Sequence, residues 1–475
     1  MITPESPERL YSTRLRTAVV ITGSGTAGAY HAGVLRALHE AGIRIDLIAG
    51  RGVGAIAAFF GAMDGGARLW DAQGVWKDPS ARGFYGWRAS LRAAGWALAA
   101  AGVILAFPLA LLAVAVLAGL LGFLLTLIGF EGTGAAVTGA YGRWIAALFA
   151  PQLLPTVIPR LALFAVLLAL VALTTGAAAG LFGRARRRRY AGGLWRILGA
   201  PLNASALFEH CSAELWNLIR GAAPLARPDT RELARRYVEL LAENIGQPGF
   251  RELLVTVHDV DARRDLVFAL LAPAQRPRFF GKTMLGDAAV RQAEAFDLGG
   301  AARDHAMDAL AAALAVPVAA EPHLIGFAAE GPWRGETHRV CDRPAALGRL
   351  LEEVAAAGAE QVIVVSAAPP AAKAHELSAG RIDLRGRAGE QLAAFESAGL
   401  RDATEHFSGR FAGLYIVRPS HNPLGPLDFG GVFDERSDRV HSVAELVDRG
   451  YEDAYRQFIE PIVAASGEQI AAVKG

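Results

Sequence analysis

The residues whose spacing suggests chemistry lie in a turn at 50–54, which reads Gly-Arg-Gly-Val-Gly. An apolar segment that predicts a short strand (45–49) precedes the turn, and an apolar stretch that predicts a helix (55–62) follows it. Strand, tight turn and helix are the setting of the nucleophile elbow G-x-S-x-G, in which a serine at the tip attacks an acyl carbon. Here the central position is Gly52, which has no side chain. The sequence therefore predicts the frame of an acyl hydrolase without its usual nucleophile.

A second glycine-rich loop, at 22–28, lies between a predicted strand (17–21) and a predicted helix (29–40). Backbone N–H groups at the start of a helix attract anions, so two such loops side by side favour a phosphate or a carboxylate. We expect both loops to face one cleft that binds a phospholipid headgroup or a fatty acid. The predicted ligand-binding residues are Gly23, Ser24, Gly25, Gly28, Gly50, Arg51, Gly52 and Gly54. For Arg51 the sequence leaves two roles open, a positive charge in this cleft or a pair with a surface carboxylate such as Asp46.

Residues 22–58 resemble the start of the patatin-like phospholipases, with a glycine loop, a helix reading His-Ala-Gly-Val-Leu-Arg-Ala-Leu at 31–38, and then the elbow. The resemblance implies a three-layer α/β/α fold, lipid acyl substrates and a Ser-Asp dyad. It makes Gly23, Gly25 and Gly28 oxyanion-loop glycines, and it makes Gly50 and Gly54 the elbow glycines.

Three positions depart from the family pattern. The family's serine falls on Gly52, and its loop Arg or Lys falls on Ala27. Its Asp-Gly pair has no clean counterpart, and Glu330-Gly331 is the nearest candidate. Glu330 is therefore the candidate catalytic carboxylate, and an ordinary loop carboxylate is the alternative interpretation.

Other polar residues near these motifs are expected to be structural. Ser24 and Thr26 lie in the glycine loop, where they would occupy an oxyanion hole rather than face it. His31 is expected to be a packed or solvated histidine. His258 and Asp259 are neighbours on a predicted strand, so their side chains point to opposite faces and do not form a dyad.

Composition excludes several function classes. The net charge of +2 gives no indication of nucleic-acid binding. Cys211 and Cys341 match no metal or redox spacing, and the histidines show no HExxH pattern. We therefore expect no metal and no cofactor. Hydrophobic residues make up 53% of the chain and charged residues 20%, which suggests that part of the chain is not in water.

That part is predicted to be an insertion with two uncharged runs, 96–130 and 161–182. A bilayer crossing needs about 20 apolar residues in a helix. Because the flanking segments are expected to build one α/β domain, the number of crossings must be even, and two crossings fit the runs. A hairpin with a third, interfacial helix, and an apolar insertion folded over the globular domain, are the alternatives.

Basic residues flank the insertion on its outer sides, at Lys77, Arg82, Arg88 and Arg92 and in an arginine-rich run at 184–189. The intervening segment 131–159 contains one, Arg143. The positive-inside rule then predicts an integral membrane protein whose globular domain is cytoplasmic, in a bacterial inner membrane.

The predicted organisation is a first part of the α/β domain at 1–91, a membrane insertion at 92–190 and a second part of the domain at 191–475. The predicted function is a membrane-anchored relative of lipid acyl hydrolases that binds phospholipid or acyl chains without Ser-Asp hydrolysis. An active phospholipase with a non-standard nucleophile and a structural membrane scaffold with a vestigial cleft are the alternatives. Its partners would be the bilayer and its lipids; protein partners are not predicted.

Overall fold

The structure is a computed structural model that describes residues 11–182, 199–281, 293–328, 333–368, 370, 384–420, 424–434 and 439–464. The chain divides into two compact units. The first consists of Met1–Gly86 and Leu202–Gly475, and the second is Trp87–Pro201. The predicted end of the insertion at residue 190 lies outside the described residues.

The first unit is built on a nine-stranded mixed sheet, with the path β11-β10-β1-β2-β5-β6-β7 and with β8 and β9 joined to it at β5. Neighbouring strands are parallel from β11 to β5, whereas β6 and β9 run antiparallel to β5. The strands are β1 (Thr17–Thr22), β2 (Leu47–Gly50), β5 (Glu252–Asp259), β6 (Arg264–Leu270), β7 (Ala293–Asp297), β8 (His323–Gly326), β9 (Thr337–Cys341), β10 (Gln361–Ser366) and β11 (Gly413–Val417). The described residues form four short strands outside this sheet: β3 (Gly86–Trp87), β4 (Leu202–Asn203), β12 (Val432–Asp434) and β13 (Arg439–His441).

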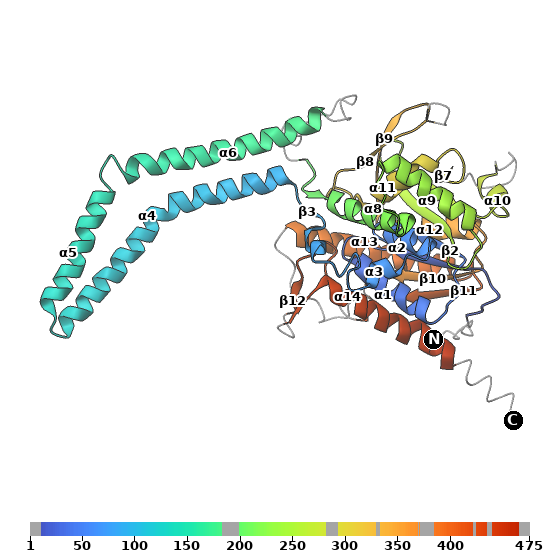
Figure 1. The fold of residues 1–475 in the computed structure, drawn as a ribbon. Coiled ribbons are helices and arrows are strands. Elements are labelled where there is room, and N and C mark those ends of the chain that lie inside the picture. Colours follow the sequence, from blue (N-terminus) through green and yellow to red (C-terminus); the bar gives the residue numbers. More distant parts are fainter. Residues whose placement is uncertain are drawn as a thin grey trace. The chain divides into compact units, whose positions relative to one another are not determined.

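Side chains alternate along the central strands between two separate cores. In β1, Val19 and Ile21 belong to one hydrophobic cluster, and Ala18 and Val20 belong to the other. Because parallel strands covered on both faces are apolar on both faces, the sequence shows them as continuous runs of Val, Ile and Ala. Helices on the two faces complete three α/β/α layers (Figure 1), which confirms the predicted fold class.

The helices of the first core are α1 (Ala27–Glu40), α2 (Gly54–Ala62), α8 (Ser205–Arg220), α9 (Thr230–Asn244), α11 (Ala306–Leu314) and α14 (Val443–Ala454). The helices that contribute to the second core are α10 (Arg276–Phe280), α12 (Leu347–Ala356) and α13 (Leu384–Phe407). Shorter helical elements are α3 (Ala67–Trp70), the 3₁₀ turns η1 (Pro79–Gly83) and η3 (Arg303–His305), and the π-turn η4 (Tyr455–Ile459). The side chain of Asp229 caps α9 by accepting a hydrogen bond from the amide of Glu232, at 2.8 Å, as expected for this residue type.

The second unit is helical. It contains α4 (Ala89–Leu127), α5 (Glu131–Leu148) and α6 (Leu154–Phe182), with Pro108 inside α4 and Pro159 inside α6. Helix α4 and the segment Leu154–Gly176 of α6 are long and apolar enough to cross a membrane, and their large side chains are mostly exposed. Figure 1 shows α4 running first beside α6 and then beside α5.

Candidate functional site

The elbow predicted from the sequence joins β2 to α2. Gly50 ends the strand, Gly54 begins the helix, and Gly52 stands between them with a φ of +55°. Residues with a Cβ rarely adopt this backbone conformation, so glycine suits the position. The structure therefore has the sharp strand-to-helix turn of a nucleophile elbow, with no side chain at its tip.

The space above Gly52 is filled by the protein itself. A Cβ atom built on Gly52 would lie 2.3 Å from the carbonyl oxygen of Gly23 and 3.0 Å from Oδ2 of Asp342. The amide of Val53 donates a hydrogen bond to the same Gly23 carbonyl, at 2.9 Å. In an elbow of this type, the amide that follows the nucleophile is one of the oxyanion donors. Here that amide is already bonded to the glycine loop.

The glycine loop is also covered on its other side. A Cβ atom on Gly25 would lie 1.7 Å from the carbonyl oxygen of Pro426, and the amide of Thr26 donates to that oxygen at 2.9 Å. A Cβ atom on Gly28 would lie 2.1 Å from the ring of Trp76. The structure thus brings the two predicted loops together, but packs them against each other and under a cover of protein.

Arg51 lies at the centre of this packed region, and 1% of it is exposed. Its guanidinium contacts Asp342 twice, Nε to Oδ1 at 3.1 Å and Nη2 to Oδ2 at 2.7 Å. Nη1 donates to Oγ1 of Thr22 at 2.7 Å and to the carbonyl oxygen of Pro344 at 2.8 Å, and Nη2 reaches Oε1 of Glu396 at 3.3 Å. A guanidinium has five N–H donors, and these five contacts use all of them.

Arg51 therefore forms its ion pairs with buried carboxylates. It does not pair with Asp46, which binds the neighbouring Arg44 on the surface. No N–H group of Arg51 is left for a phosphate or a carboxylate ligand.

The buried charges shift the titration of this cluster. Burial alone lowers the pKa of Arg51, but the carboxylates of Asp342 and Glu396 outweigh it and hold this pKa above its usual value. Burial raises the pKa of Glu396, and Arg51 and the hydrogen bond from Ser24 only partly oppose that rise. The hydroxyl of Ser24 donates to Oε1 of Glu396 at 2.7 Å. We call Thr22, Ser24, Arg51, Asp342 and Glu396 the arginine cluster.

Two members of this cluster were not found from the sequence. Asp342 follows directly after β9, and Glu396 lies within α13. A carboxylate at the end of a strand that meets the elbow would have been the signal for Asp342, but nothing local marks the middle of a long helix. Glu330, the carboxylate proposed from the sequence, lies outside the described residues.

The remaining candidates have structural roles. His31 is fully buried, its Nε2 lies 3.1 Å from the carbonyl oxygen of Thr22, and burial lowers its pKa to about 3. His258 bonds to Asp265 on the neighbouring strand, at 2.8 Å, so the prediction that it does not pair with Asp259 is correct. Among the described residues, no group of three or more His, Cys, Asp or Glu side chains is placed to bind a metal.

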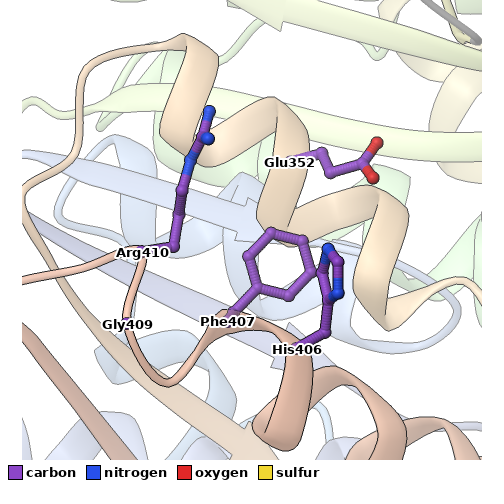
Figure 2. A pocket seen from close by; sticks show the side chains of 5 residues that line it. All are labelled: Glu352, His406, Phe407, Gly409 and Arg410. Atoms are coloured by element: carbon purple, nitrogen blue, oxygen red, sulfur yellow. The ribbon is translucent and has the colours of Figure 1, made fainter.

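A pocket of about 410 Å³ lies elsewhere in the first unit (Figure 2). It is lined by Glu352 of α12, by His406 and Phe407 at the end of α13, and by Gly409 and Arg410 after it. None of these residues belongs to the elbow, the glycine loop or the arginine cluster.

The chain is similar to a known protein family and to a solved structure. The family model described as patatin-like phospholipase matches residues 19–337. The crystal structure of VipD from Legionella pneumophila is similar with 14% sequence identity, 94% of this chain and 67% of that chain covered, and a TM-score of 0.30. No curated protein matches the chain. Because the family model covers well over half of the sequence, the chain belongs to the patatin-like phospholipase family.

Proposed function

We propose that this protein is a membrane-anchored member of its family that no longer performs Ser-Asp hydrolysis and works at the bilayer as a non-catalytic unit. The observation that carries the proposal is the filled elbow: the Gly23 carbonyl and Asp342 occupy the space that a nucleophile at position 52 would need.

The chemistry of ester hydrolysis supports this interpretation. The reaction needs a hydroxyl to attack the carbonyl carbon, a base to accept its proton and N–H donors to stabilise the oxyanion. Gly52 supplies no hydroxyl. The amide of Val53 donates to Gly23, and Asp342 is held by Arg51. The hydroxyl is thus absent at position 52, and the groups that would serve as base and as oxyanion donor are engaged within the protein.

The same geometry decides which lipid contact we propose. The sequence suggested a phospholipid or acyl ligand at the glycine loop, with Arg51 as the positive charge that attracts the anionic group of the ligand. Since all five donors of Arg51 are used and Trp76 and Pro426 cover the loop, we place the lipid contact at the insertion instead. The exposed apolar side chains of α4 and α6 support the bilayer itself as the partner.

Charge placement supports the orientation that we propose. The basic residues before α4 and the arginines at 184–189 flank the insertion, which favours a cytoplasmic globular domain and a bacterial inner membrane.

A second candidate function is hydrolysis with Ser24 as the nucleophile. It is favoured by the 2.7 Å hydrogen bond from Ser24 to Glu396, a buried pair in which the carboxylate could accept the hydroxyl proton. An acyl-serine would form as the alcohol leaves, and water would then release the fatty acid. Ser24 is 1% exposed and Glu396 also binds Arg51, so this reaction would require the loop to open.

The test is fatty-acid release from phosphatidylglycerol and phosphatidylethanolamine vesicles by the purified full-length protein in detergent micelles. Labelling by a fluorophosphonate serine probe is measured in parallel. We compare the wild type with Ser24→Ala and with Ser408→Ala, a matched control at an exposed serine whose hydroxyl bonds locally to Glu405.

We expect no release and no labelling in any of the three proteins. Release or labelling that disappears in Ser24→Ala and persists in Ser408→Ala would overturn the proposal in favour of the second candidate. Release that both variants retain would also overturn it, because another nucleophile would then be active.

A further inference from the structure

Helix α4 has two different partners along its length. Its first half packs on α6, where Ala94 and Ala97 form an apolar cluster with Ala169. Its second half packs on α5, where a Cβ atom on Gly134 would lie 2.5 Å from the carbonyl oxygen of Gly122. We call Ala89–Phe107 with α6 the basal pair, and Leu109–Leu127 with α5 the distal hairpin. Pro108 separates them, and Figure 1 shows the direction of α4 changing along its length.

The uncharged runs of α4 and α6 differ in length, and only the run in α6 matches the thickness of the bilayer. As one helix, the run 93–130 would be about 57 Å long, whereas the hydrocarbon core is about 30 Å thick. In α6, the run 161–182 is about 33 Å long and matches one crossing. In α5, the run between Glu131 and Arg143 is about 17 Å long and is too short to cross. Among the described helices, the distal half of α4 therefore has no partner that can cross the bilayer with it.

Both helices of the basal pair are apolar on their exposed sides. Helix α4 exposes five large hydrophobic side chains before Pro108, and α6 exposes a row of them between Leu161 and Val171. Those of α4 are Trp96, Leu98, Val103, Leu105 and Phe107. A helix pair that is apolar all round suits a position with acyl chains on every side.

The distal hairpin differs, because its two helices present unlike surfaces. Helix α4 exposes ten large hydrophobic side chains after Pro108: Leu109, Leu112, Val114, Val116, Leu117, Leu120, Leu121, Phe123, Leu124 and Leu127. Helix α5, which is described throughout, exposes one, Trp144. The rest of its outer surface carries glycine, alanine and threonine, together with Glu131 and Arg143. The hairpin as a whole is therefore amphipathic, with one apolar helix and one weakly polar helix.

An amphipathic body lies in the plane of the interface, with its apolar side towards the acyl chains and its polar side towards the headgroups. Trp144 and Arg143 are residue types that occupy the headgroup level. The side-chain distribution of the hairpin thus matches a position along one leaflet better than a position across both.

We propose that the basal pair crosses the bilayer and that the distal hairpin lies along the leaflet farther from the chain's two junctions with the first unit. Its α4 side contacts acyl chains and its α5 side contacts headgroups. This inference rests on the membrane anchoring proposed above and adds which part of the insertion crosses and which part does not.

The test measures the depth of single positions in the full-length protein reconstituted into phosphatidylcholine and phosphatidylglycerol vesicles. Single cysteines replace Leu112, Leu117 or Leu124, which are exposed along the distal part of α4. Each carries an environment-sensitive fluorophore, and lipids with nitroxides at different acyl positions quench it. The wild type gives the labelling background, because its two cysteines are buried.

For a hairpin in the leaflet plane, the three fluorophores show no progressive change of depth from position 112 to position 124, since an in-plane helix does not change depth along its axis. For a helix that crosses, their depths spread over about 18 Å, because twelve residues rise that far. The second result would overturn the inference. Absence of lipid quenching at all three positions would also overturn it, because a second copy of the chain or water would then cover these leucines.

Leu98→Cys and Leu105→Cys on the basal part of α4 are the matched controls. We expect their depths to differ by about 10 Å, as for a crossing helix. Should these two positions escape lipid quenching as well, the proposed anchoring fails. Should they show the gradient while the distal positions also show one, only the inference about the hairpin fails.

Discussion

The two units place the same kinds of side chain in opposite environments. In the first unit the large aromatic residues Trp76, Phe59 and Phe60 are buried, and even a charged residue, Arg51, is enclosed with partners for every donor. In the second unit Val103 is 71% exposed and Leu109 68%, and the one charged residue of α4, Arg92, lies in its first turn. Apolar composition by itself thus does not say whether a segment forms a core. The polar groups near the segment distinguish the two cases. A protein core encloses charged groups that are paired, whereas a helix that faces lipid has no charged groups along the part that contacts the acyl chains.

Breaking the arginine cluster should give the largest effect in the first unit. Arg51→Met leaves Asp342 and Glu396 buried without their cation, and we expect the free energy of unfolding to fall by about 3–5 kcal/mol. Urea denaturation of the detergent-solubilised protein measures this change.

Arg44→Ala is the control for that measurement, since Arg44 pairs with Asp46 while 58% of its side chain is exposed. Loss of such a surface pair should cost less than about 1 kcal/mol. Combining Arg51→Met with Asp342→Asn and Glu396→Gln should restore much of the lost stability. Equal losses in Arg51→Met and Arg44→Ala would show that the cluster is not a stabilising element.

The corresponding change in the second unit places a charge where apolar side chains are exposed. Leu105→Arg should reduce membrane integration, because an arginine near the centre of a crossing helix costs about 2.5–3.5 kcal/mol on insertion scales. Carbonate extraction of membranes measures the integrated fraction. Leu225→Arg, at a leucine that is 52% exposed in the first unit, is the control and should leave that fraction unchanged. If the membrane-integrated fraction were unchanged in both variants, the exposed apolar side chains of the second unit would not be needed for integration, and the contrast with the first unit would fail.

Gly52→Ser tests whether the elbow can be restored by one substitution. We expect no fatty-acid release from vesicles and a loss of about 2–3 kcal/mol of unfolding free energy, because the new side chain meets the Gly23 carbonyl. The loss has two contributions, the strain of a side chain at positive φ and the clash with the Gly23 carbonyl. Gly42→Ser measures the strain alone, because Gly42 also has a positive φ, +65°, but a Cβ atom there meets nothing within 4 Å. Its cost should be about 1 kcal/mol. Hydrolysis by Gly52→Ser would show that the site is open.

The smallest effect that we predict depends on pH. Burial alone raises the pKa of Asp308, but hydrogen bonds from His305 and His323 outweigh it and lower this pKa to about 2, from 3.8. Because the pKa is depressed in the folded protein, ionised Asp308 contributes about 2 kcal/mol above pH 3.8, and this contribution is lost as the pH falls towards 2. The difference in unfolding free energy between the wild type and Asp308→Asn should therefore shrink between pH 5 and pH 2. Asp402→Asn, at a side chain that is 73% exposed, should show no such trend.

The sequence predicted the features that depend on local patterns. The elbow, the glycine loop and the elements beside them, β1, α1, β2 and α2, follow from short runs of residues, and the structure has their bounds within two residues of those predicted. The prediction for His258 was correct because strand alternation alone decides it.

What the sequence did not predict depends on contacts between distant parts of the chain. Asp342 is separated from Arg51 by 291 residues and Glu396 by 345, and no motif links these positions. Trp76 and Pro426, which cover the glycine loop, likewise belong to segments whose position only the packed fold defines. The burial of Arg51 was not predicted for the same reason, since both roles suggested for it assumed an open surface.

The contact between the Gly23 carbonyl and the elbow has a consequence for how this protein can evolve. A single base change converts a glycine codon into a serine codon, so an elbow that had lost only its serine would regain it easily. Once the backbone of the loop has settled into the vacated space, that mutant is disfavoured and the loop must move first. Under the proposed loss of Ser-Asp hydrolysis, a return to an active enzyme then requires several coordinated substitutions and not only the one at position 52.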